Sequence, residues 1–230
     1  MSPVLAHVRR ALVLPGAAVL TVAVLAACGS DDPPTADAPT DAGVSSGSVV
    51  PEPSSDDSAV DGAEGGVEVR LQDPSGADLG TATLAPDEAG TSVTVEAEGM
   101  PPGWHGFHVH ATGLCEPDSP DPADPTKVGD FLSAGGHVGE GESAHGDHTG
   151  DLPALQVAQD GTASMEATTD RFTVEELLDA DGSAVMVHSG PDNLANVPPR
   201  YAPGGPDAET LATGDSGTRI ACGVVERRGG

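Results

Sequence analysis

The sequence predicts an all-β domain, a sandwich or barrel of eight short strands joined by turns and by two long loops. Two observations lead to this prediction. From Gly66 onward, apolar and polar residues alternate with period two over short runs, which is typical of half-buried strands. Clusters of glycine, proline and aspartate separate the runs, as expected for turns between strands.

Each expected strand is a run of alternating residues. In the fourth run, Phe107 and Val109 share one face and should enter the core. His108 and His110 share the opposite face and should leave the core together. In order along the chain, the runs are 67–71, 81–85, 92–98, 107–111, 154–159, 163–169, 184–189 and 219–225.

Two connecting segments are too long and irregular to be ordinary turns. They span 116–152 and 190–218. Loops of this length in a compact domain are usually functional or disordered, so any function is expected there. A third connection, between the sixth and seventh strands, should contain one or two helical turns, because Thr173 and Glu176 form a capping box.

The N-terminal segment 1–27 is expected to be a signal peptide. Arg9 and Arg10 precede an apolar run that ends in small residues. The run approaches the length of a transmembrane anchor, which is the alternative. The letters LAAC at 25–28 resemble the lipobox of bacterial lipoproteins and favour lipidation of Cys28. The expected location is therefore the cell envelope, with the lipid anchored in the outer face of the bacterial plasma membrane.

Residues 28–65 are expected to form a disordered acidic linker behind the lipidated cysteine. The segment holds no aromatic and no basic residue, and it is rich in serine, proline, alanine, glycine and aspartate. Such a composition cannot bury enough apolar surface to offset the entropy lost on ordering. The folded domain is therefore expected to be 66–230.

The charge of the chain excludes one class of partner. Nine basic residues face 37 acidic ones, giving a formal net charge of −28. A protein this acidic is not expected to bind nucleic acid. An anionic substrate would require a local positive site.

The three cysteines divide between two uses. With Cys28 assigned to the lipid, Cys115 and Cys222 remain in the domain. In an exported protein, two remaining cysteines indicate one disulfide. Closing so long a loop would stabilise the fold by roughly 4–5 kcal/mol.

The histidines of the domain fall into groups with metal-ligand chemistry. A strand histidine alone is usually a surface or hydrogen-bonded residue, and an acidic loop with several histidines can simply be solvated. One group holds three imidazoles and a carboxylate, the ligand types and number of a tetrahedral zinc site. It comprises His137, His145, His148 and Asp151. The strand histidines form an all-imidazole group that suits copper, comprising His108, His110 and His188.

Five blocks of the sequence, taken together, resemble the copper,zinc superoxide dismutase family in its bacterial exported branch. The blocks are GFHVHATGLC, SAGGH, HTGDLPAL, VMVHSGPDN and GTRIACGVV, and they occur in family order over about residues 66–226. The resemblance implies an eight-stranded Greek-key β-barrel and the conversion of superoxide to dioxygen and hydrogen peroxide. It implies copper and zinc as cofactors and leaves both a monomer and a homodimer open.

The resemblance also implies a role for each matching residue. His137 would bridge the two metals through its two ring nitrogens. Asp192 would hydrogen-bond one ligand of each metal, although an Asx turn in GPDN is the alternative. Cys115 and Cys222 match the family disulfide, and Arg219 matches the active-site arginine beside copper. The implied copper ligands are His108, His110, His137 and His188, and the implied zinc ligands are His137, His145, His148 and Asp151.

One departure from the family pattern concerns the zinc loop. Only two residues separate His145 from His148, fewer than the family usually has. Loss of zinc is therefore an alternative, although all four ligand types are present.

Two other functions remain open from the sequence. One is a lipid-anchored copper-binding or copper-buffering protein on a dismutase scaffold. The other is a cell-surface adhesion sandwich, which leaves the histidines unexplained.

Overall fold

Seven antiparallel strands form the main sheet of the protein, in a computed structural model that describes residues 65–227. Their order is β5-β10-β11-β1-β2-β3-β9. The bounds are β1 (Val67–Gln72), β2 (Asp78–Asp87), β3 (Gly90–Ala97), β5 (Phe107–His110), β9 (Ala163–Thr169), β10 (Ser183–His188) and β11 (Arg219–Val225).

Part of the chain lies outside this description, namely residues 1–64 and 228–230. The expected signal peptide, the lipidation of Cys28 and nearly all of the acidic linker fall there. Within 65–227, no helix is long and apolar enough to cross a membrane.

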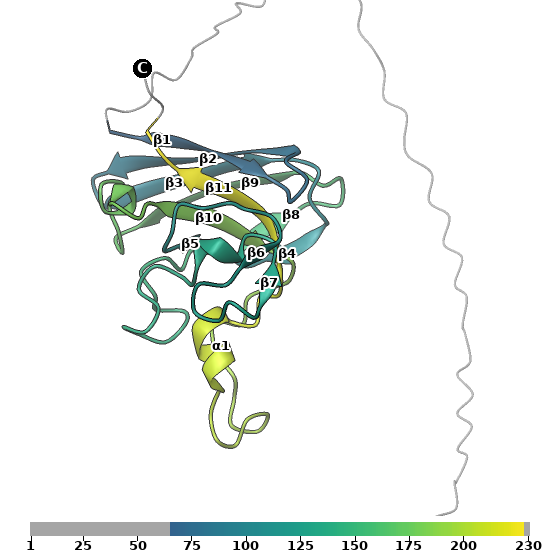
Figure 1. The fold of residues 1–230 in the computed structure, drawn as a ribbon. Coiled ribbons are helices and arrows are strands. Elements are labelled where there is room, and N and C mark those ends of the chain that lie inside the picture. The colour runs from purple at the N-terminus through teal and green to yellow at the C-terminus, as the bar shows by residue number, and fades with distance from the viewer. Residues whose placement is uncertain (1–64, 228–230) are drawn as a thin grey trace, which may run out of the picture. The chain divides into compact units, whose positions relative to one another are not determined.

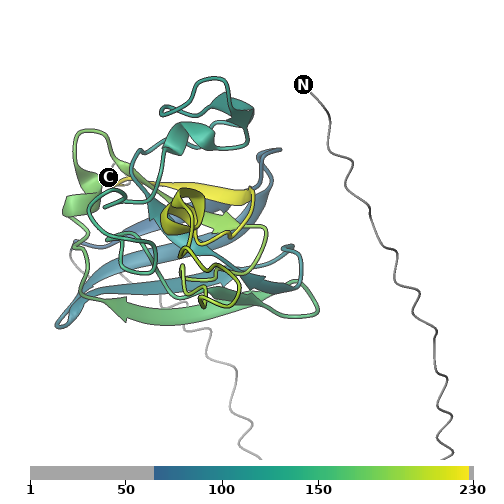
Figure 2. The same ribbon diagram turned by 90° about the horizontal axis from the view of Figure 1, so that it is seen from below.

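The main sheet curls round its core, and a short strand pair connects its two ends (Figures 1 and 2). Strand β4 (Gly103–His105) precedes β5 with one residue between them, and it pairs with β8 (Leu155–Val157). Strand β8 in turn precedes β9, the other edge of the main sheet. The all-β class is therefore confirmed.

The number and pairing of the strands differ from the expectation. The expected strand 154–159 is shorter and pairs with β4 rather than joining the main sheet. Strand β4 was not expected, and neither were β6 (Ser119–Pro120) and β7 (Val128–Gly129), a two-residue pair inside the first long loop. Elements this short carry no detectable alternation.

The inner face of the curled sheet holds the hydrophobic core. In β1 every second residue is buried, with Val67, Val69 and Leu71 at 4% exposure or less. Burial of each such side chain contributes about 1.5–3 kcal/mol. Phe107 and Val109 join this core, as the alternation in β5 predicts.

The outer face of β5 is not exposed to solvent, which corrects the simplest interpretation of its pattern. His108 and His110 point away from the core, yet they are 0% and 1% exposed. The long loops cover this face, and a second, smaller apolar cluster lies beneath them. Polar groups buried in this way need partners, because burying them unpaired is unfavourable.

The first long loop runs alongside β5 and pairs with it. The Val109 N–H donates to the Gly150 carbonyl at 2.8 Å, and the Val138 N–H donates to the Val109 carbonyl at 2.9 Å. A Cβ on Gly150 would lie 2.2 Å from the Val109 oxygen, so only glycine permits this approach. The pairing sets Asp151 opposite His108, and likewise His137 opposite His110.

A short 3₁₀ helix follows β9, as the capping box predicts. Helix η2 covers Glu176–Leu178. The Thr173 N–H donates to Glu176 Oε2 at 2.8 Å, and the Glu176 N–H donates to Thr173 Oγ1 at 3.3 Å.

The second long loop contains a helix that was not expected, α1 (Ala208–Thr213). Asp207 caps it by accepting the Thr210 N–H at 2.9 Å. Gly214 ends it in the left-handed conformation, with φ of 59°. Both signals are visible in the sequence, but the helix is shorter than two turns and shows no periodicity.

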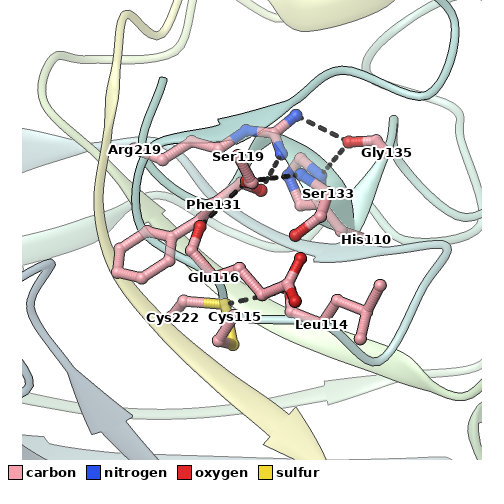
Figure 3. Close-up of a disulfide and its surroundings, with 10 residues drawn as sticks. All are labelled: His110, Leu114, Cys115, Glu116, Ser119, Phe131, Ser133, Gly135, Arg219 and Cys222. Atoms are coloured by element: carbon pink, nitrogen blue, oxygen red, sulfur yellow. Dashed lines mark hydrogen bonds between the residues drawn. A yellow bond between two sulfur atoms is a disulfide. The ribbon is translucent and has the colours of Figure 1, made fainter. Parts of the chain in front are cut away.

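The expected disulfide joins Cys115 to Cys222, with 5.7 Å between their Cα atoms (Figure 3). It fastens the start of the first long loop to β11. The two cysteines are 107 residues apart in the chain. Because the closed loop is so long, the bond stabilises the fold by about 4–5 kcal/mol in the chain-entropy account.

Candidate metal centre

Six buried imidazoles and two carboxylates converge between β5, β10 and the two long loops. Their ligand atoms form two overlapping groups, each within 4.8 Å of one another. The first group is His108, His110, His137 and His188, and the second is His108, His137, His145 and Asp151. His148 belongs to neither group by this measure, but its Nδ1 lies 3.4 Å from Nδ1 of His137, so every residue that the sequence offered as a metal ligand lies at this centre.

In the first group, hydrogen bonds decide which ring nitrogen faces inward. Nδ1 of His110 donates to the Gly135 carbonyl at 2.8 Å, and Nδ1 of His188 donates to the Gly217 carbonyl at 3.2 Å. In both rings Nε2 then carries a lone pair. These two Nε2 atoms lie 3.4 Å apart, although neither can donate to the other. Two acceptors held face to face are typical of ligands that share a cation.

His108 supplies an unsatisfied atom to the first group. Its Nε2 donates to Asp192 Oδ2 at 2.6 Å, which leaves Nδ1 as an acceptor. That Nδ1 is buried and has no hydrogen-bond partner within 65–227. An orphaned buried acceptor costs about 1–3 kcal/mol, and a metal ion would satisfy it.

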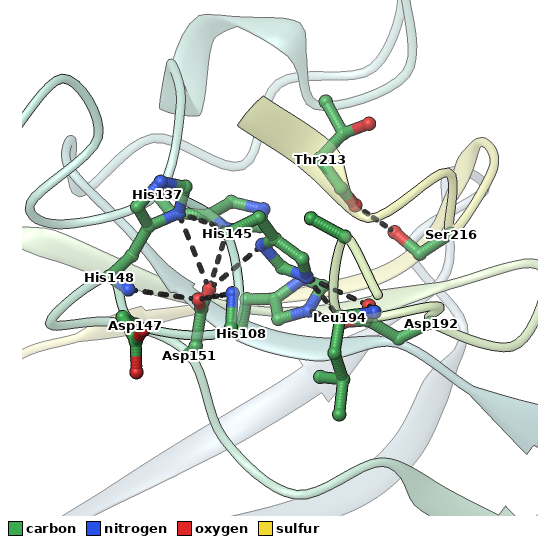
Figure 4. Close-up of polar contacts among 12 residues, drawn as sticks. His108, His137, His145, Asp147, His148, Asp151, Asp192, Leu194, Thr213 and Ser216 are labelled. Atoms are coloured by element: carbon green, nitrogen blue, oxygen red, sulfur yellow. Dashed lines mark hydrogen bonds and ion pairs between the residues drawn. The ribbon is translucent and has the colours of Figure 1, made fainter. Parts of the chain in front are cut away.

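At the second group, the Nδ1 atoms of His137, His145 and the adjacent His148 surround one oxygen of Asp151 (Figure 4). Oδ1 of Asp151 lies 2.8, 3.2 and 3.5 Å from the Nδ1 atoms of His137, His145 and His148, respectively. Nδ1 of His148 lies 3.4 Å from Nδ1 of His137. Ligands at tetrahedral corners, about 2.0 Å from zinc, are about 3.3 Å apart. These four side chains therefore have the separations of a zinc site, despite the short spacer between His145 and His148.

His108 lies close enough to belong to both groups, but it can be a ligand in only one of them. Its Nε2 is hydrogen-bonded to Asp192, so only Nδ1 is free. One free nitrogen can bind only one ion. His148 offers an alternative fourth ligand for the second group, because its Nε2 donates to the Ser143 carbonyl at 3.1 Å and leaves Nδ1 free. The assignment of His108 to the first group and His148 to the second gives each group four ligands.

His137 differs from the other five rings. Its Nδ1 faces Asp151 and His148, both in the second group. Its Nε2 has no hydrogen bond to any described residue, whereas each of the other rings donates one N–H to a carbonyl or carboxylate. A ring with both nitrogens left for ligands can serve both groups at once.

Asp192 connects the two groups by accepting a hydrogen bond from one histidine of each (Figure 4). Its carboxylate accepts from Nε2 of His108 at 2.6 Å and from Nε2 of His145 at 2.8 Å. It also accepts the Leu194 N–H at 2.7 Å, so it forms an Asx turn as well. Both interpretations of this residue from the sequence are therefore compatible with its contacts.

Burial and charge set the protonation of the centre. Burial lowers the pKa of His137 to about 4, and burial together with Arg219 holds the pKa of His110 well below its usual value. Both rings are therefore neutral near pH 7. Burial disfavours a charged His145, but its neighbours Asp151 and Asp192 outweigh that effect and raise its pKa to about 9. Metal ligands must be deprotonated, so zinc binding at this ring would compete with its protonation.

Arg219 lies beside the first group and shares a carbonyl with it (Figure 3). Its guanidinium donates to the Phe131 carbonyl at 2.5 Å and to the Gly135 carbonyl at 2.6 Å. The Gly135 carbonyl also accepts from His110, so the arginine and this ring are positioned by one backbone atom. Burial lowers the pKa of Arg219 to about 10, which still leaves it charged at neutral pH.

A cavity of about 670 Å³ opens onto His110, His137, His188 and Arg219. Its wall has more acidic than basic side chains, since only Lys127 and Arg219 are cationic. The acidic members are Asp121, Asp130, Glu140, Glu209 and Asp215. Two bound divalent ions would therefore contribute most of the positive potential in this cavity.

His105 is the one other histidine among the described residues. Its two ring nitrogens face the backbone carbonyls of His188 at 2.7 Å and Pro101 at 2.8 Å, so this ring is not a ligand.

Some groups that orient the site could not be found from the sequence. The carbonyls of Ser143, Gly135 and Gly217 orient ligand rings, but a backbone carbonyl has no sequence signal.

Comparison with known proteins agrees with this geometry. A family model described as copper/zinc superoxide dismutase (SODC) matches residues 79–225. A superoxide dismutase [Cu-Zn] of Mycolicibacterium paratuberculosis is 39% identical over 89% of the chain and 93% of the relative. One of Mycobacterium tuberculosis is 42% identical over 67% of the chain and 68% of the relative. The structure of the Cu/Zn superoxide dismutase from Brucella abortus is 30% identical, with a TM-score of 0.54, over 70% of the chain and 99% of that protein.

The hydrogen bond between Asp192 and His145 depends on a glycine. A Cβ on Gly214 would lie 2.1 Å from Asp192 Oδ1 and 2.3 Å from His145 Nε2. We expect Gly214→Ala to separate this pair and to lower the affinity of the second group for Zn²⁺ by about 10- to 100-fold, the usual cost of losing a ligand's hydrogen-bond partner. Titration of Zn²⁺ against a competing chelator measures the affinity.

Gly205→Ala is the matched control for this substitution. Gly205 also has positive φ, 86°, but has no atom within 4 Å of its Cβ position, so it carries the backbone strain without the clash. Equal Zn²⁺ affinities for the two variants would contradict the role given to the Asp192–His145 hydrogen bond.

Proposed function

The chain belongs to the copper/zinc superoxide dismutase family, and from that premise we propose which of its residues carry each part of the reaction. The reaction converts two superoxide anions and two protons to dioxygen and hydrogen peroxide. The observation that carries the proposal is one imidazole, His137, shared by two ligand groups at the base of a cavity that also holds a guanidinium. Relatives that are named superoxide dismutases give no support to a copper-buffering function.

The first group is assigned to copper and the second to zinc. Copper, when bound, supplies the one-electron redox chemistry that superoxide dismutation requires. Imidazole nitrogens alone suit copper, while three imidazoles and a carboxylate suit zinc. The copper ligands are His108, His110, His137 and His188, and the zinc ligands are His137, His145, His148 and Asp151.

His137 has the properties of the proton carrier. Its lowered pKa leaves the ring neutral at neutral pH, and its Nε2 has no hydrogen bond to any described residue, so this nitrogen is available to carry a proton to a reduced substrate and gives it up readily. Its Nδ1 stays directed at the zinc group, where Asp151 lies 2.8 Å away. The ring is thereby kept in place while its other nitrogen changes protonation.

Arg219 has the properties of the anion guide. It is a partly buried cation at the wall of the cavity, fixed by two carbonyls on one side. A fixed guanidinium attracts and orients a small anion, and low-dielectric walls strengthen the attraction. This role matters more here because acidic side chains outnumber basic ones in the cavity.

An activity measurement tests these assignments. The metal-loaded full chain should dismute superoxide, followed by stopped-flow decay of superoxide absorbance. His110→Ala should lose bound copper and activity together. Arg219→Glu should keep its copper, lose about 10-fold or more in rate, and speed up rather than slow down as salt is added, because salt then screens a repulsion.

Arg70→Glu is the control for Arg219→Glu. It changes the net charge by the same amount, but on β1, where Arg70 pairs with Asp78 at 3.5 Å. Its rate should match that of the wild type. If Arg219→Glu kept the wild-type rate and salt dependence, Arg219 would not guide the anion. If the metal-loaded wild type decayed superoxide no faster than free copper, the proposed function would be wrong.

We propose that this activity is located in the cell envelope. Residues 1–27 have the pattern of a signal peptide, and Cys28 follows a lipobox-like sequence, which supports attachment to the membrane by lipid. On this proposal, the chain made in a bacterial host enters the detergent phase of a two-phase partition, and its Cys28→Ser variant stays in the aqueous phase. Aqueous partition of both proteins would contradict the lipid anchor.

A further inference from the structure

We infer that Arg171 is the positioning residue of the zinc group: it holds the short loop between His145 and His148 in the conformation that binds metal. The inference rests on the zinc site proposed above. Nothing in the sequence singles out Arg171, which follows β9 and lies more than twenty residues from the loop it contacts.

The first observation is the contact between the guanidinium and the loop. Nη1 of Arg171 donates to the His148 carbonyl at 2.8 Å, and Nη2 donates to the Gly146 carbonyl at 2.9 Å. Nη2 also lies 3.5 Å from Asp147 Oδ1. One side chain thus contacts three consecutive residues: the backbone carbonyls of Gly146 and His148 and the side chain of Asp147. These residues adjoin or include the two proposed zinc ligands of the loop, His145 and His148.

The second observation is that the same peptide segment is held from inside by Asp151. Oδ2 of Asp151 accepts the Gly146 N–H at 2.7 Å and the His148 N–H at 3.0 Å. Its Oδ1 faces the three ring nitrogens. The N–H groups of Gly146 and His148 are therefore fixed by a zinc ligand, and their carbonyls are fixed by Arg171.

The third observation is that Arg171 itself is anchored to the rigid part of the fold. Its neighbour Phe172 is 2% exposed in the hydrophobic core, and the Phe172 carbonyl accepts from Thr91 Oγ1 at 2.9 Å. The Arg171 N–H donates to Thr169 Oγ1, at the end of β9, at 3.2 Å. The arginine therefore fixes the loop relative to the sheet, although the loop has no strand or helix of its own.

The spacing of the two zinc histidines explains why such a support is needed. With only two residues between His145 and His148, the backbone must turn tightly so that both rings face one point. Holding that turn before metal arrives reduces the entropy lost on binding. A planar guanidinium can donate to two carbonyls at fixed separation, whereas an ammonium group cannot reproduce that geometry.

The sign of the effect separates positioning from electrostatics. A cation beside a cation-binding site opposes binding, so removing the charge alone would strengthen zinc binding. Loss of a positioning contact would weaken it. The two accounts therefore predict opposite changes in zinc affinity for a neutral variant.

The test compares Arg171→Met and Arg171→Lys with the full wild-type chain, each prepared without metal and with its disulfide intact. The probes are Co²⁺, whose visible spectrum reports tetrahedral coordination, Zn²⁺ competing with it, and Cu²⁺ titrated against a chelator. Arg171→Met should weaken Zn²⁺ binding by about 10- to 100-fold, as loss of an outer hydrogen-bond partner does. Cu²⁺ binding should stay unchanged, and Arg171→Lys should lie between wild type and Arg171→Met.

Arg70→Met is the matched control, since it removes another partly exposed arginine that pairs with one carboxylate, and it should bind both metals as the wild type does. Unchanged or stronger Zn²⁺ binding by Arg171→Met would overturn the inference, and so would an equal loss of Zn²⁺ and Cu²⁺ affinity. If Arg171→Met does not fold, the same comparison of Zn²⁺ with Cu²⁺ for Arg171→Lys decides. A wild type that gives no tetrahedral Co²⁺ spectrum would overturn the zinc site itself along with the inference.

Discussion

The metal centre depends on one pattern of hydrogen bonds: five of its six imidazoles donate an N–H outward, so that the remaining nitrogens point inward as lone pairs. The acceptors are the carbonyls of Ser143, Gly135 and Gly217 and the carboxylate of Asp192. Converging lone pairs repel one another, and an acceptor left buried without a partner, such as Nδ1 of His108, costs about 1–3 kcal/mol. Such an arrangement is reasonable only if cations compensate it, which makes metal binding and local folding one process.

The curled sheet makes this convergence possible because it supplies a rigid surface on which the loops are laid. Strand β5 presents two imidazoles on its outer face, and β10 adds His188 from the neighbouring strand. The first long loop pairs with β5 and brings His137 and Asp151 to the same face. The disulfide fixes one end of this loop to β11, the strand that carries Arg219. The candidate ligands, Arg219 and the covalent crosslink therefore share one framework, although they come from distant parts of the chain.

Much of this could be predicted from the sequence, and the rest could not for identifiable reasons. Alternation locates seven strands of the main sheet, and the two remaining cysteines indicate the disulfide. The pattern at His108 and His110 gives the correct face but not its burial, because the covering loops have no periodicity. Helix α1 escapes notice because it is shorter than two turns. The contacts of Arg171 with the loop between His145 and His148 join remote segments, and so do most of the hydrogen bonds that orient the imidazoles. Several of these contacts involve backbone carbonyls, which every residue has.

The central claim is that two different metal ions share the ring of His137. Anomalous diffraction from crystals of the copper- and zinc-loaded protein, with data collected at both absorption edges, tests it most directly. The account predicts a copper peak among His108, His110, His137 and His188, and a separate zinc peak among His137, His145, His148 and Asp151. A single peak, or two peaks of which one lies away from the His137 ring, would contradict it.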